Sequence, residues 1–112
     1  MLIQGRATHL RNTPRKVNLV AASIVGLNVD KALEKLQFTL RRASDPVSKV
    51  LKQTVANAVN NFKLNRQDLI IKEAFATKGR VLERGWMGSR SRYKPYERVH
   101  SHLTIKLEAK KK

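Results

Sequence analysis

The sequence predicts an α+β domain with three helices packed on a small three-stranded antiparallel sheet, from which a long β-hairpin protrudes. Three observations indicate this fold. Apolar residues recur at helical spacing in three segments between residues 13 and 62. Segments of extended character lie near both ends and around residue 70, and a glycine- and arginine-rich stretch separates the last two. With 112 residues and no internal repeat, the chain is expected to be one domain, 1–112.

The first two elements are a short strand and a helix. Residues 2–11 contain spaced apolar residues and end before a helix start, which is typical of a strand. Thr13 and Pro14 then open a helix, because a threonine side chain can accept free N–H groups and proline fits the first helical position. Gly26 ends this helix. Its predicted buried face consists of Val17, Val20, Ala21 and Ile24.

Two further helices follow, each opened by an aspartate. Asp30 is expected to cap the second helix, and its predicted buried face is Leu33, Leu36 and Leu40. The longest helix is expected to start at Asp45-Pro46, or a few residues earlier, and to end within 61–65. Its predicted apolar stripe is Val47, Leu51, Val55, Ala58 and Phe62.

Two strands are predicted in the second half of the chain. In 69–77 the alternation is imperfect, since Glu73 has the same parity as Ile71 and Phe75. The alternation in 99–107 is regular. There the residues expected on the core side are Val99, Ser101, Leu103, Ile105 and Leu107, and those expected on the other side are His100, His102, Thr104 and Lys106.

The stretch 78–98, called the arm below, links these two strands. A structureless loop of this length is unusual in a small domain, so two explanations remain: disorder, or a hairpin that projects from the core. Ten residues on each side would reach about 30 Å, beyond the radius of gyration of about 13 Å expected for such a domain. The predicted body is then 1–77 with 99–108, and 109–112 forms a basic tail.

The charge of the chain points to an anionic partner. Lys and Arg number 24 against 8 Asp and Glu, a formal net charge of +16. The arm holds seven of these cations and two glutamates, and other clusters lie near Arg11, at Arg41-Arg42 and at Lys110–Lys112. Such a charge repels itself unless a polyanion is bound, and nucleic acid is the commonest one. In the arm, Arg and Lys suit phosphates, and the aromatic residues Trp86, Tyr93 and Tyr96 are candidates for base stacking.

Other function classes find little support. The absence of cysteine excludes disulfides and thiolate metal sites, and no apolar run approaches the roughly 18 residues of a membrane span. His100 and His102 share a strand face, but further ligands, for which His9 and Glu97 are candidates by type alone, would be needed for a metal. The carboxylates are scattered and no nucleophile motif is present. We therefore expect no enzyme, no metal and no cofactor.

Several short motifs follow one another along the chain in a characteristic order: Arg11-Asn12-Thr13-Pro14-Arg15-Lys16, Leu19-Val20-Ala21, Gly26, Ala32-Leu33, Phe38-Thr39, Ala56-Asn57-Ala58, Asp68-Leu69, Phe75, Gly79, Arg84 and Ser101-His102-Leu103-Thr104-Ile105. Their order and spacing resemble the bacterial-type family of ribosomal protein L22, a protein of the large subunit. The resemblance covers nearly the whole chain. The sequence departs from the family at the hairpin, where Arg80 follows Gly79 in place of proline and 87–92 replaces the usual Pro-Arg-Ala-x-Gly-Arg. These changes indicate a divergent or organellar member.

The resemblance implies a structural constituent of the large subunit that binds its RNA, assists its assembly and lines the nascent-peptide exit tunnel with the hairpin tip. The partners implied are large-subunit ribosomal RNA, neighbouring large-subunit proteins and the nascent polypeptide, in a bacterial cytoplasm or an organelle; no homo-oligomer is expected. The predicted RNA-binding residues are Arg6, Arg11, Arg15, Lys16, Lys78, Arg80, Arg84, Arg90, Arg92, Lys94, Arg98 and His102. The predicted tunnel-wall residues are Arg84, Gly85, Trp86, Met87, Gly88, Ser89 and Arg90.

One alternative within nucleic-acid binding remains open. An architectural DNA-binding protein can use a basic β-arm, with Trp86 or Pro95 as an apolar wedge in the minor groove. Such proteins usually act as dimers that embrace DNA from two sides. The charge outside the arm is explained more simply by a monomer surrounded by folded RNA.

Overall fold

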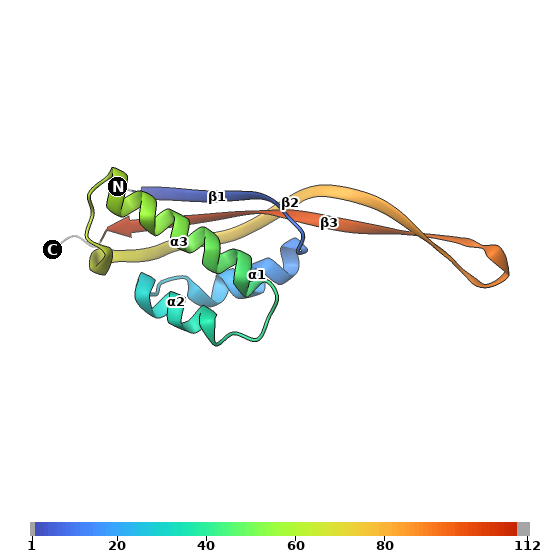
Figure 1. The fold of residues 1–112 in the computed structure, drawn as a ribbon, viewed down its shortest axis with the longest axis horizontal. Coiled ribbons are helices and arrows are strands. Elements are labelled where there is room, and N and C mark those ends of the chain that lie inside the picture. Colours follow the sequence, from blue (N-terminus) through green and yellow to red (C-terminus); the bar gives the residue numbers. More distant parts are fainter. Residues whose placement is uncertain (1, 110–112) are drawn as a thin grey trace.

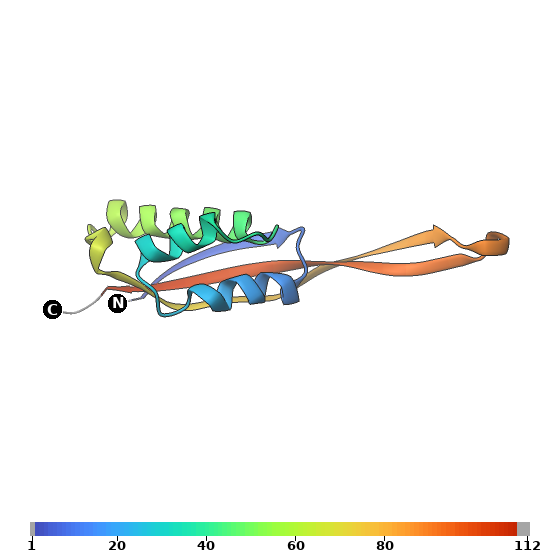
Figure 2. The same cartoon turned by 90° about the horizontal axis from the view of Figure 1, so that it is seen from below.

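Three helices pack against one face of a three-stranded antiparallel sheet, and two of the strands continue far beyond the helices (Figures 1 and 2). This computed structural model describes residues 2–109, so the predicted basic end Lys110–Lys112 lies outside the described residues. The elements are β1 (Leu2–Leu10), α1 (Pro14–Ile24), α2 (Val29–Gln37), α3 (Ser44–Asn61), β2 (Leu69–Met87) and β3 (Tyr93–Ala109), with short 3-10 turns at Arg66–Asp68 and Ser89–Ser91. The predicted fold class is confirmed.

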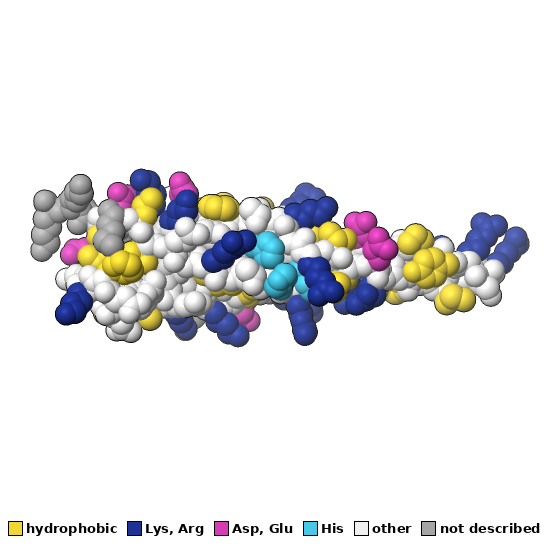
Figure 3. All heavy atoms as spheres, turned by 90° about the horizontal axis from the view of Figure 1, so that it is seen from above, with side chains coloured by type: hydrophobic (Ala, Val, Ile, Leu, Met, Phe, Trp, Pro, Cys, Tyr) yellow, Lys and Arg dark blue, Asp and Glu magenta, His cyan; other side chains and the backbone are white. Residues whose placement is uncertain are grey.

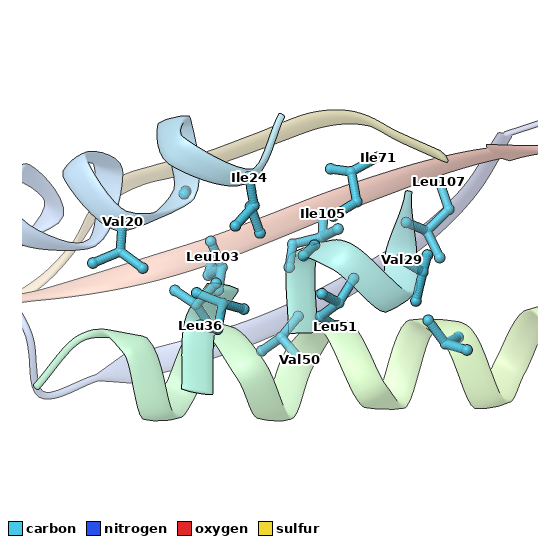
Figure 4. Close-up of a cluster of buried hydrophobic side chains, with 14 of the residues drawn as sticks. Val20, Ile24, Val29, Leu36, Val50, Leu51, Ile71, Leu103, Ile105 and Leu107 are labelled. Atoms are coloured by element: carbon cyan, nitrogen blue, oxygen red, sulfur yellow. The ribbon is translucent and has the colours of Figure 1, made fainter. Parts of the chain in front are cut away.

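The central strand of the sheet is β3, which pairs with β1 on one side and with β2 on the other. Its alternation is as predicted for Leu103, Ile105 and Leu107, which are fully buried, and for His102 and Lys106, which are half-exposed on the opposite face. Thr104 lies on that opposite face but is buried, since it is paired with Arg6 and Phe75 of the neighbouring strands. Figure 4 shows these leucine and isoleucine side chains directed toward those of all three helices. The hydrophobic core therefore lies between the helices and one face of the sheet.

The first helix buries the predicted face, Val17, Val20, Ala21 and Ile24. Pro14 occupies its first turn, also as predicted. Thr13 occupies the N-cap position, but the expected side-chain bond is wrong, since its hydroxyl makes no capping hydrogen bond. The fixed backbone angle of Pro14 therefore marks this helix start without help from a side-chain acceptor.

The cap of the second helix lies two residues before the predicted one. The side chain of Asn28 accepts a hydrogen bond from the Asp30 backbone N–H at 3.1 Å, so Asn28 is the cap and Asp30 lies in the first turn. The helix also ends early, at Gln37, which leaves Leu40 outside it and 99% exposed. Of the predicted face, Leu36 is buried and Leu33 packs partly buried against the core, so only Leu40 is wrong. The helix also buries Val29 and Ala32.

The third helix begins at Ser44 and buries most of its predicted stripe. Phe62 does not belong to that stripe, because the helix ends at Asn61 and the Phe62 side chain is 42% exposed. Thr54 is buried instead and lies directly over Gly5 of β1, where an added Cβ would come within 1.7 Å of the threonine Oγ1. This close approach seats α3 against the backbone of the edge strand.

A bulge in β2 explains the imperfect alternation of that strand. The pairing with β3 shifts between Ile71 and Glu73, so the core-facing residues change parity from Leu69 and Ile71 to Ala74 and Ala76. The expectation that Phe75 shares a face with Ile71 is therefore wrong. Its ring is 38% exposed on the opposite face of the sheet, where the Lys106 Nζ lies 5.9 Å from the ring centroid.

Candidate nucleic-acid interface

The arm is a two-stranded extension of the sheet that no helix covers. The strands pair from Val81 with Val99 to Met87 with Tyr93, and no residue of 78–98 is fully buried. The molecule extends 67 Å along its longest axis and 25 Å and 17 Å along the others. Its radius of gyration is 17.1 Å, against about 13 Å for a compact chain of this size. Of the two explanations for this stretch, the structure shows the projecting hairpin.

One face of the arm combines aromatic and cationic side chains. The strand register places Arg84 opposite Tyr96 and Trp86 opposite Lys94 on this face. The Trp86 and Tyr96 rings are 5.0 Å apart, and the guanidinium of Arg98 lies 5.9 Å from the Tyr96 centroid. Each such contact stabilises the paired form of an exposed hairpin by about 0.5–1 kcal/mol. Trp86 nevertheless remains 62% exposed, so its ring can still stack on another planar group.

The opposite face of the arm is less basic. Glu83 lies directly opposite Glu97, and such like-charged pairs across two strands are destabilising. Farther out, the Tyr93 ring lies across Gly85, where an added Cβ would come within 2.0–2.3 Å of three ring atoms. Gly85 is thus required for close packing, and Tyr93 covers the backbone that this glycine leaves open.

The tip of the arm is a tight turn within 88–92. The backbone N–H of Gly88 donates to the Arg92 carbonyl, and that of Arg92 donates back to Ser89 at 3.4 Å. Arg90 and Ser91 both adopt left-handed backbone angles, with φ of 58° and 57°. Two-residue hairpin turns require such angles and normally use asparagine and glycine. The backbone thus holds the Arg90 side chain exposed at the far end of the molecule.

The root of the arm forms a basic groove with the loop before α1. The residues that line it include Arg11, Thr13, Arg84, Glu97, Arg98 and His100. The fold thus brings together predicted cations that lie more than 70 residues apart in the sequence. His100 lines the same groove but is absent from the predicted RNA-binding residues, although its place in the alternating strand indicated an outward side chain.

Histidines meet beside this groove but do not form a metal centre. The backbone N–H of His9 donates to His102 Nδ1 at 3.2 Å, and the two rings meet edge to face at 5.1 Å. Gly79 lies under His102, since an added Cβ would be 3.1 Å from its Nε2. An acceptor at Nδ1 leaves His102 with its proton on Nε2. Within residues 2–109, no three His, Asp or Glu side chains come together as metal ligands would.

The remaining predicted residues are spread over the surface. Figure 3 shows dark-blue Lys and Arg side chains at the root of the arm and at its tip, with apolar and acidic side chains between them. Arg6 lies on β1, and Lys94 lies next to the tip on the aromatic face. Arg15 and Lys16 are exposed in the first turn of α1, while Lys78, Arg80 and Arg92 are exposed on the arm.

The cations of the arm are free for an external anion. The described part of the chain contains three ion pairs, and all of them lie on the body: Arg66 with Asp30, Lys72 with Glu108, and Lys106 with Glu73. Within the arm, Arg84 donates only to the backbone carbonyl of Glu83, at 3.0 Å. An unpaired guanidinium presents its planar set of donors to phosphate oxygens. No helix within 2–109 has the length and apolar character to cross a membrane.

Comparisons with known proteins identify the family of this chain. The model of the family described as ribosomal protein L22p/L17e matches residues 5–108. Three similar curated proteins are each named large ribosomal subunit protein uL22. The one from Cereibacter sphaeroides is 43% identical over 99 residues, which are 88% of this chain and 79% of the relative. The proteins from Paracoccus denitrificans and Rhizobium meliloti are 44% and 42% identical, over 88% and 91% of this chain and 78% and 79% of the relatives.

These relatives are named as ribosomal proteins, which form a structural and not an enzymatic family. The match extends through the body and the arm, and the identity exceeds two residues in five. This chain belongs to the family of ribosomal protein L22p/L17e and is a structural constituent of the large ribosomal subunit of bacterial type.

Proposed function

We propose that the chain binds large-subunit ribosomal RNA through the arm and the basic groove at its root, and that it assists the folding of that RNA during assembly. The observation that carries this proposal is the set of seven arm cations, none of which pairs with a carboxylate in the described structure. Lys and Arg side chains that replace counterions on phosphates supply most of the affinity of such interfaces.

The body and the arm have different parts in this proposal. The groove holds Arg11, Arg84 and Arg98 close together, which suits a place where RNA phosphates converge. The aromatic face beyond it offers Trp86 and Tyr96 to unpaired bases. The groove would fix the register of the protein on the RNA, and the arm would extend between RNA segments.

The tip has a separate proposed role. It lies at the end of the molecule remote from the helices, and its turn exposes Arg90 together with the neighbouring Met87, which is 75% exposed (Figure 1). The family resemblance implies that this tip, 84–90, lines the wall of the nascent-peptide tunnel while the body lies near the tunnel exit. The nascent polypeptide and neighbouring large-subunit proteins are then the further partners, in a bacterial cytoplasm or an organelle.

Site-specific crosslinking within assembled large subunits tests this proposal. A photoreactive residue in place of Met87 is expected to crosslink to large-subunit RNA in vacant subunits and additionally to a stalled nascent chain in translating ribosomes. A photoreactive residue in place of Lys31, which is exposed on α2, serves as the control and is expected to give no nascent-chain adduct. RNA adducts without nascent-chain adducts at Met87 would refute the tunnel assignment, and the absence of both would refute the proposal.

A further inference from the structure

The two outer edges of the sheet differ in how their backbone groups are satisfied. On β2, Ile71 donates to the Leu27 carbonyl at 3.0 Å and accepts from Gly26 at 2.8 Å. Ala76 donates to the side-chain oxygen of Asn18 at 2.7 Å and accepts from its amide nitrogen at 3.1 Å. The edge of β2 beside the body is therefore closed by a backbone segment and by one asparagine side chain.

The edge of β1 has no such cover. Within residues 2–109, no backbone or side-chain group outside the sheet bonds to the main chain of Leu2–Ala7. Figure 1 shows β1 along the outer margin of the sheet. A sheet edge with unpaired N–H and C=O groups is a template for another strand.

The register identifies which residues of β1 face outward. In an antiparallel pair, successive residues direct their backbone groups alternately toward and away from the neighbouring strand. Because Ile71 and Ala76 point away from β3, their partners Leu107 and Leu103 point away from β2 and hence toward β1. The partners of Leu107 and Leu103 in β1 are Ile3 and Ala7, so these two turn toward β3.

It follows that Leu2, Gln4 and Arg6 direct their N–H and C=O groups to the open edge. The usable edge ends after Ala7, where the register shifts and His9 adopts a left-handed angle of 58°. Beside this edge runs a groove lined by Gln4, Arg6, Gln53, Asn57, Asn60 and Asn61. The wall that α3 presents to an incoming strand is thus made of amide side chains.

We propose that the β1 edge, Leu2–Ala7, binds an extended peptide segment of a neighbouring large-subunit protein as a fourth strand of the sheet. Along this edge the outward N–H and C=O groups recur at every second residue, a spacing of about 6.8 Å. An extended peptide has its own acceptors and donors at the same spacing and can pair with them. The amide wall selects polar side chains, and Arg6 selects a carboxylate beside it. A second copy of this chain does not fit, because each copy carries a charge of +16.

This inference rests on the proposed place of the chain among large-subunit proteins and is tested by amide hydrogen exchange. The full chain is compared in its free form and within purified large subunits, with electron-transfer fragmentation to resolve single residues. In the free chain the amides of Gln4 and Arg6 are expected to exchange fast, while those of Ala76 and Ile71, already bonded, exchange slowly and serve as internal controls. In subunits, Gln4 and Arg6 are expected to slow at least about tenfold.

Two variants refine the test. Gln4→Pro removes the outward N–H without removing a bond to β3, and Gln4→Ala retains that N–H as the matched control. In subunits, Gln4→Pro is expected to abolish the slow exchange of Arg6, whereas Gln4→Ala preserves it. Loss of the slow exchange of Ala76 would show that Gln4→Pro fails to fold. In that case the exchange of Gln4 and Arg6 in the unmodified chain still shows whether a peptide is bonded to the edge.

Crosslinking from a photoreactive residue at Leu2 identifies the occupant. A contiguous peptide of another ribosomal protein is expected. An adduct to RNA or to a second copy of this chain would overturn the inference, as would fast exchange of Gln4 and Arg6 in subunits that contain the chain. Each of these results leaves RNA binding by the arm intact, whereas failure of the chain to enter subunits would count against the proposed function.

Discussion

The basic groove at the root of the arm makes a quantitative prediction for RNA binding. Arg84→Gln and Arg98→Gln together remove two of the three guanidinium groups that converge there, while side-chain polarity is retained. Neither group pairs with a carboxylate within the described residues, so their loss leaves no buried charge. Arg98→Gln removes the contact with the Tyr96 ring, about 0.5–1 kcal/mol within the arm, and should leave the fold of the body unchanged.

The magnitude follows from counterion release. Each phosphate contact contributes about 0.7–0.9 to the slope of the logarithm of the association constant against the logarithm of the salt concentration. Two lost contacts should reduce that slope by about 1.4–1.8. When the salt concentration rises from 50 to 200 mM, the affinity of both proteins for RNA falls, and the fold-loss should be roughly ten times smaller for the variant than for the unmodified chain. At low salt the variant should bind more weakly than the unmodified chain.

Fluorescence anisotropy with large-subunit ribosomal RNA at four or five salt concentrations measures both slopes. The matched control is the double variant Lys31→Gln and Lys49→Gln, which removes two exposed cations from α2 and α3. We expect the control to change the slope by much less. Equal slopes for the two double variants would show that net charge alone drives binding, and would refute a specific role of the groove.

Three further predictions concern packing and the arm. Gly5→Ala should lower the free energy of unfolding by about 1–3 kcal/mol, because the new Cβ meets the Thr54 Oγ1. Urea unfolding of Gly5→Ala, Thr54→Gly and the double variant forms a double-mutant cycle, in which Thr54→Gly should recover part of that loss. Simple additivity of the two effects would contradict the contact. Trp86→Ala should speed amide exchange in the arm by up to about tenfold through loss of the Tyr96 contact, with the helices unaffected as the control. Ser91→Gly should relieve about 1 kcal/mol of left-handed strain and slow exchange of the tip amides, whereas Ser89→Gly, outside the left-handed pair, should not.

The parts of the fold that depend on local sequence were predictable. Pro14 marks a helix start through its own backbone angle, and the regular alternation of 99–107 predicts which side chains β3 directs to the core. The arm was also indicated, because a glycine-rich basic segment with exposed aromatic residues cannot enter a small core. The basic side chains of the arm therefore follow from the sequence without knowledge of the tertiary structure.

The parts that depend on contacts between distant segments were not predictable. The side chain of Asn18 closes the β2 edge at Ala76, and nothing in either local sequence indicates the other. The bulge near Lys72 reverses the facing of Phe75, because one extra residue changes parity for the remainder of a strand. The convergence of Arg11 with Arg98 likewise arises only when the loop before α1 meets the root of the arm.

The tip of the arm is connected to the hydrophobic core through the continuous strand β3. This strand runs unbroken from Tyr93 to Ala109, and its second half contributes Leu103 and Ile105 to the core. Where the arm leaves the core, the pairing shifts between Lys78 and Val81, and the His102 ring packs over Gly79. A larger side chain at Gly79 would displace that ring and tilt the arm. Because packed interiors deform little, the direction of the tip is set at this junction, while the aromatic contacts farther out govern only whether the arm holds its own strands together.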